Sequence, residues 1–123
     1  MSYDLYFWKQ RASTSMPPAD TWSKIDAGSP PDFVERLASV SFVEGIKSAF
    51  PGIMENKTTN PAVPVQLICE PSDGGCFIVT WSEYMLTVEA HGVETHHFNT
   101  LIDIAHSVGA ALYDPQTDVR YEG

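Results

Sequence analysis

Three short runs rich in β-branched and aromatic residues follow one another closely, at residues 65–70, 76–81 and 84–90. The first two are separated by Pro, Ser, Asp and two Gly residues at 71–75, a composition typical of a turn, and Ser82 and Glu83 form the next bend. Strand-like runs joined by connections this short are typical of hairpins. The segment is therefore predicted to form an antiparallel meander.

The first residues predict another strand, at 3–9. Alternation along a strand places Tyr3, Leu5 and Phe7 on one face and Asp4, Tyr6 and Trp8 on the other. Both faces are aromatic, so we expect this strand to be central in the sheet or covered on both sides.

The clearest helical signal lies at residues 92–108, where the apolar residues recur at the spacing of one buried helix face: Phe98, Leu101, Ile102, Ala105 and Val108. Gly109 fits the position after the last helical residue. A short strand at 110–113, a turn at 114–117 and a brief pairing segment at 119–121 are expected to follow.

The first half of the chain is less regular. Residues 10–29 are rich in Ser, Thr and Pro and predict a long loop, whose Trp22 is expected to dock on the body of the domain. A helix is predicted from an N-cap at Ser29 to about Val40, and a second one from a capping box at Ser41 and Glu44 to about Phe50. Residues 55–64 predict a polar loop.

The predicted order of elements is β-α-α-β-β-β-α-β. A chain of 123 residues holds one hydrophobic core, so we expect a single α+β domain over 1–123. Its sheet is expected to be mainly antiparallel, with the helices packed on one face.

The charge of the chain is strongly negative and unevenly distributed. Sixteen Asp and Glu residues oppose seven Lys and Arg, which gives a formal net charge of −9. Residues 58–123 account for −8 of it, with Arg120 as their only Lys or Arg. A field of this sign repels nucleic acid and anionic lipid, and it speeds encounter with a basic protein. The predicted partner is therefore a basic protein, with no direct nucleic-acid or membrane contact.

The candidate partner-binding residues are the carboxylates expected at strand ends, at turns and near the start of the last helix. They are Glu70, Asp73, Glu83, Glu89, Glu94, Asp114 and Asp118. Lys and Arg side chains of a partner are their natural counterparts.

No catalytic constellation is apparent, so the chain is not expected to be an enzyme. His91, His96, His97 and His106 lack the spacing of a helical metal site, and we expect solvated histidines, no metal and no cofactor. Cys69 and Cys76 are expected to be reduced and mostly buried. A small enzyme that uses a Cys or His centre, or a subunit that mainly self-associates, remains an alternative.

The N-terminus lacks a basic region before its apolar run, and no apolar stretch approaches the length of a membrane span. This pattern predicts a cytoplasmic protein. We also expect the protein to be a monomer.

Two segments carry a resemblance. The opening MSYDLYFW and the closing IAHSVGAALYDPQ, at residues 1–8 and 104–116, resemble small immunity proteins of bacterial polymorphic toxin systems. The resemblance covers about 20 residues and transfers no functional residue. It implies a cytoplasmic protein that binds and blocks a cognate toxin domain. Because immunity proteins against nucleic-acid-directed toxins are often acidic, it also implies a target with a basic groove.

Overall fold

The computed structural model describes residues 2–11, 15–57, 59 and 65–121. Its strands are β1 (Ser2–Gln10), β2 (Val34–Glu35), β3 (Met54–Lys57), β4 (Val65–Cys69), β5 (Cys76–Trp81), β6 (Leu86–His91), β7 (Ala111–Asp114) and β8 (Val119–Tyr121). Its helices are α1 (Pro18–Asp26), α2 (Ser39–Ala49) and α3 (Thr95–Ser107).

The strands form one antiparallel sheet in the order β3-β4-β5-β6-β1-β7-β8, and β2 pairs with the last residues of β1. The predicted meander is β4-β5-β6, and the aromatic strand β1 is central, between β6 and β7. The predicted α+β class with a mainly antiparallel sheet is confirmed.

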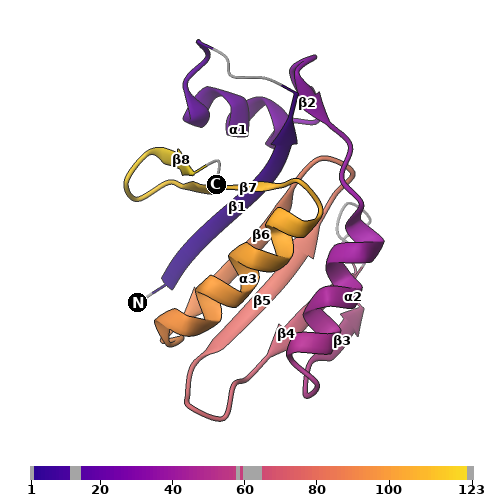
Figure 1. Ribbon diagram of the computed structural model, residues 1–123, viewed down its shortest axis with the longest axis vertical. Helices are drawn as coiled ribbons and strands as arrows, with labels where there is room; N and C mark the ends of the chain where they lie inside the picture. Colours follow the sequence, from indigo (N-terminus) through magenta and orange to yellow (C-terminus); the bar gives the residue numbers. More distant parts are fainter. Residues whose placement is uncertain (1, 12–14, 58, 60–64, 122–123) are drawn as a thin grey trace.

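The alternation along β1 divides the interior into two clusters. Leu5 and Phe7 face a large core with the inner sides of α2 and α3, whereas Trp8 faces a smaller core that includes Ile25 of α1. Figure 1 shows α2 and α3 side by side across the sheet, with α1 set apart near the end of β1. Two helices thus share one face as expected, and α1, which the sequence did not predict, adds a layer on the other.

The loop predicted at 10–29 is wrong, because α1 lies within it; residues 12–14 lie outside the described part of the chain. Pro17 and Pro18 are typical of a loop, but Pro is also favoured in the first turn of a helix. The N–H groups of that turn have no acceptor within the helix, so the N–H that Pro lacks is not missed. Ala19, Trp22 and Ile25 then recur every three residues and pack against the smaller core.

The helix predicted from Ser29 to Val40 is also wrong. Val34 and Glu35 instead form β2, which pairs with Gln10 and Lys9 of β1. The apolar residues of this segment serve two different clusters, Val34 in the smaller and Leu37 in the larger core. They therefore do not share one buried face, as a helix over this segment would require.

Two smaller predictions of the first half also fail. The second predicted helix is confirmed as α2, but its capping box at Ser41 and Glu44 is wrong, because the helix begins at Ser39 and contains both residues. The loop predicted at 55–64 begins in β3, where Glu55–Lys57 pair with β4. Residues 58 and 60–64 of that loop lie outside the described residues, as do Met1 and residues 122–123.

The C-terminal half follows the predicted pattern. Helix α3 begins three residues later than residue 92, and Gly109 has the positive φ of 80° expected after a helix end. Strands β7 and β8 pair with each other as expected. In the described part of the chain, no helix has the length and apolar character needed to cross a bilayer.

Candidate functional site

Six of the seven predicted partner-binding carboxylates lie at one end of the sheet, where β1 begins and β6 ends. We call this surface the acidic end; it consists of Glu70, Asp73, Glu89, Glu94, Asp114 and Asp118. Figure 1 shows the start of α3 and the β4–β5 turn along the lower left border of the molecule, and the β7–β8 turn higher on the left side. All six except the buried Asp114 are exposed.

Glu83 lies apart from the others, in the β5–β6 turn at the opposite end of the sheet. Several basic residues are also at that end, and they are engaged there. Lys9 lies 3.5 Å from Glu35, Arg36 lies 3.9 Å from Glu83, and Arg11 donates to the carbonyl of Asp32. The structure thus separates much of its positive charge from the acidic end.

Asp114 and Asp118 are fixed by tyrosine hydroxyls. The hydroxyl of Tyr3 donates to Oδ2 of Asp114, and the backbone N–H of Gln116 donates to Oδ1 of Asp114 at 2.9 Å. The hydroxyl of Tyr113 donates to Asp118 at 2.9 Å. Asp114 therefore acts as the anchor of the β7–β8 turn, joining it to the start of β1. Asp118, exposed and at a φ of 55°, is the carboxylate of the pair that a partner can reach.

These bonds predict a loss of stability at alkaline pH. The hydrogen bond to Asp114 raises the pKa of Tyr3 from 10.0 to about 12. The pKa of Tyr113 is also raised to about 12, mainly by burial and secondly by its hydrogen bond to Asp118. A tyrosine whose pKa is higher in the folded than in the unfolded state stabilises the fold fully below pH 10, and this stabilisation is lost as the pH approaches 12. Melting temperatures measured across this window should fall in the wild type and fall less steeply in Tyr3→Phe.

The control for this prediction is Tyr84→Phe, because Tyr84 lies in the β5–β6 turn at the opposite end of the sheet, away from both bonds. It should keep the wild-type slope of melting temperature against pH. Equal slopes in the wild type and in Tyr3→Phe would show that the Tyr3–Asp114 bond does not contribute.

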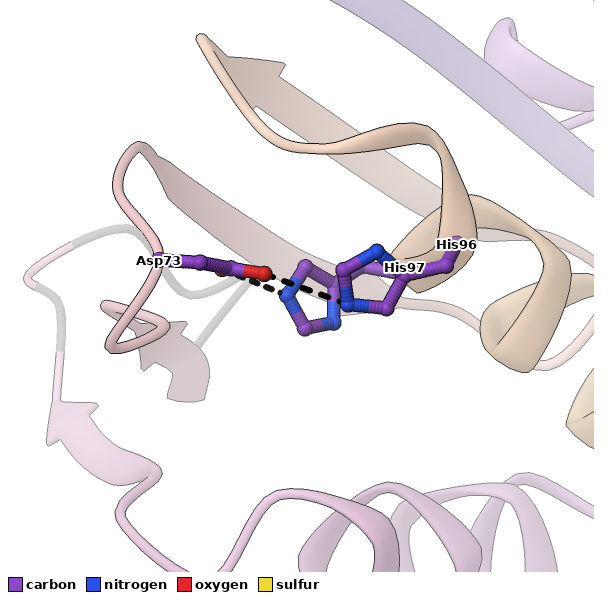
Figure 2. Close-up of side chains that lie close together, drawn as sticks. All are labelled: Asp73, His96 and His97. Atoms are coloured by element: carbon purple, nitrogen blue, oxygen red, sulfur yellow. Dashed lines mark hydrogen bonds and ion pairs between the residues drawn. The ribbon is translucent and has the colours of Figure 1, made fainter.

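Asp73 gathers two histidines from α3, as Figure 2 shows. Nε2 of His97 lies 2.8 Å from Oδ1 of Asp73, and Nε2 of His96 lies 3.1 Å from Oδ2. The two imidazole ring centroids are 4.0 Å apart. The hydrogen bond from His97 lowers the pKa of the Asp73 carboxyl, so the carboxylate is held in its charged form.

Glycines bring the two loops of this cluster together. Gly75, just before β5, and Gly92, just after β6, both have positive φ, and a Cβ on Gly75 would lie 2.5 Å from the carbonyl oxygen of Gly92. Only the absence of a side chain at Gly75 permits this approach. The β4–β5 turn that carries Asp73 is thereby held against the loop that leads into α3.

This close approach predicts that Gly75→Ala destabilises the protein more than Gly74→Ala. Both glycines have positive φ, but a Cβ on Gly74 meets open space. Both variants therefore carry backbone strain, at φ of 107° and 79°, but only Gly75→Ala adds the clash with Gly92. We expect the difference in unfolding free energy to be about 1–3 kcal/mol in urea denaturation. Equal losses in the two variants would contradict the packing described.

The expectation of solvated histidines is wrong for His97. Its side chain is 15% exposed and its ring lies 5.6 Å from that of Phe50, measured between centroids. Spacing within the helix could not reveal the cluster, because its carboxylate comes from another element. The strand register could have revealed the cluster, because Cys76 pairs with His91 and the turn before β5 therefore meets the loop after β6.

The cysteines are free and lie on opposite faces of the sheet. Cys69 belongs to the larger core, and burial raises the pKa of its thiol, which makes it a poor nucleophile. Cys76 is half-buried and lies opposite His91 across β5 and β6. His91 is in turn 3.2 Å from Glu89, so a thiol, an imidazole and a carboxylate come from neighbouring positions.

A pocket of about 610 Å³ lies between α1 and the β5–β6 hairpin. Trp22, whose ring is 5.2 Å from that of Tyr6, lines it, which agrees with the expectation that this residue docks on the body of the domain. The pocket is also lined by Tyr84, Met85, Asp26 and Glu83. Among the described residues that line it there is no His or Cys, so it does not coincide with the cysteine and histidine groups above.

Comparisons with protein-family models, with curated proteins and with solved structures give no match to this chain.

Proposed function

We propose that this chain is a protein-binding module that docks a basic protein domain on its acidic end. In its most specific form, it is a cytoplasmic immunity protein that neutralises a bacterial toxin domain with a basic, nucleic-acid-directed groove. The observation that carries the proposal is that Glu70, Asp73, Glu89 and Glu94 lie at one end of the sheet, and that the β7–β8 turn with Asp118 points toward the same end. The resemblance of the two terminal segments supports the more specific form.

The acidic end also offers apolar surface, which a stable interface needs in addition to charge. Strand β8 is the last strand of the sheet, and Val119 at its start is 42% exposed, whereas Tyr121, 47% exposed, lies farther along the strand opposite Leu112. Val119 directly follows Asp118. An aromatic or aliphatic anchor beside a carboxylate is a common composition of an interface hot spot.

The test is capture of the partner by the tagged protein from a lysate of its source organism. We expect a basic protein to be retained in stoichiometric amount at about 0.1 M salt and released at about 1 M, where screening shortens the Debye length from about 10 Å to about 3 Å. The captured protein should carry an activity, such as nuclease activity, that this chain inhibits. A captured protein that is not basic, or whose activity is unaffected, would contradict the proposal.

A small cysteine-dependent enzyme is the second candidate, favoured by the placement of Cys76 opposite His91. Such a centre requires a thiolate at neutral pH, which alkylates much faster than an ordinary thiol. Alkylation of Cys76 at the rate of an ordinary exposed cysteine would remove this candidate. Self-association through Trp22 is less favoured, because that ring already packs against Tyr6 within the chain.

A further inference from the structure

We propose that Asp73, His96 and His97 form a binding site for a divalent transition metal, with Zn²⁺ as the ion that fits best. The site shares Asp73 with the acidic end, but metal binding there does not require the proposed docking function. It rests on three side chains whose ligand atoms, one from each residue, all lie within 4.8 Å of one another.

The donor atoms have the chemistry of a zinc site. Two imidazole nitrogens and one carboxylate are the protein ligands of several zinc centres, in which a water completes the coordination. Ca²⁺ and Mg²⁺ prefer sites built from oxygen alone, so the two histidines select against them. Both histidines present Nε2 to the same carboxylate, one to each oxygen.

Two of the three separations between ligand atoms are already close to those of a metal site, and the third is within 4.8 Å. Bonds of about 2.0–2.1 Å in a tetrahedral arrangement place ligand atoms about 3.3 Å apart. The two observed separations between Nε2 and the carboxylate are 2.8 Å and 3.1 Å. A metal ion replaces the two hydrogen bonds, and each neutral imidazole then binds through the lone pair of Nε2.

The surroundings hold the ligands and leave a path for the ion. His97 is packed against Phe50, and the contact between Gly75 and Gly92 fixes the turn of Asp73. The side chains of His96 and Asp73 are 64% and 38% exposed, so the outer side of the site is open to solvent. Glu70 and Glu94 belong to the same acidic end, and their charge attracts a dication.

The test is a calorimetric titration of the purified full chain with zinc chloride. We expect one Zn²⁺ per chain, and at least about tenfold weaker binding in His96→Gln and in Asp73→Asn. His106→Gln is the matched control, because His106 is exposed on the same helix and outside the cluster. It should bind as the wild type does, and millimolar Mg²⁺ should not compete.

Co²⁺ provides a second readout, since its visible absorption reports four-coordination directly. The wild type and His106→Gln should show this absorption, and His96→Gln should lose it while keeping the wild-type circular dichroism. His96 is the best position to change because it is the more exposed of the two histidines. The absence of zinc uptake by the wild type, or equal uptake by His96→Gln and His106→Gln, would overturn the site.

Discussion

Trp8→Ala is expected to lower the free energy of unfolding by about 3–5 kcal/mol, the usual cost of removing a fully buried large aromatic side chain. Trp8 is 0% exposed, and its ring centroid lies 5.4 Å from that of Tyr113. The guanidinium of Arg120 lies 5.1 Å from the ring, and Nε1 donates to Gln10 at 2.9 Å. Because small domains are stable by only about 5–15 kcal/mol, urea denaturation should reveal a severe loss.

Two further variants keep this prediction measurable if Trp8→Ala does not fold. Trp8→Phe retains most of the volume and should lose about 0.5–3 kcal/mol. Trp22→Ala should lose less than Trp8→Ala, since Trp22 is only half-buried. A loss under about 1 kcal/mol in Trp8→Ala would contradict the central position of β1. The expected result would show that Trp8 serves the stability of the fold.

The sequence predicts the second half of this fold well because its signals are local and mutually consistent. Strand β5 has the predicted bounds, and α3 lies within the predicted helix. Strand β5 consists of apolar and β-branched residues throughout and follows Gly75, and the helical spacing of α3 continues until shortly before Gly109. The meander has short connections, so neighbours in sequence are also neighbours in the sheet.

The first half is predicted poorly because its short elements depend on tertiary contacts. Residues 34 and 35 extend only because the end of β1 is there to pair with them. Val34 and Leu37 are three residues apart, a spacing compatible with a helix, but the two side chains enter different cores. Helix α1 has only nine residues, too few for propensity alone to stabilise it.

The candidate site likewise has one part that the sequence can predict and one part that depends on tertiary contacts. Strand order is enough to place Glu70, Glu94 and Asp118 at one end once the meander and β7 are known. The burial of Asp114 and the meeting of Asp73 with His97 depend on side-chain contacts across 111 and 24 residues of sequence. No periodicity in the chain contains that information.

Charge reversal at the acidic end is expected to weaken binding of the captured partner by at least about 100-fold, because like charges then face each other across the interface. The variant is the triple change Glu70→Lys, Glu89→Lys and Glu94→Lys, at exposed positions. Its matched control reverses Asp26, Asp32 and Glu83, which are also exposed and lie toward the opposite end. Both triple variants change the formal net charge from −9 to −3.

The deciding measurement is therefore the dissociation constant of the purified partner for the wild type and for these two variants, at one salt concentration. Docking on the acidic end predicts the large loss in the first variant and a change within about threefold in the second. An equal loss in both would show that net charge alone governs the association. Unchanged binding by the acidic-end variant would contradict the proposed surface.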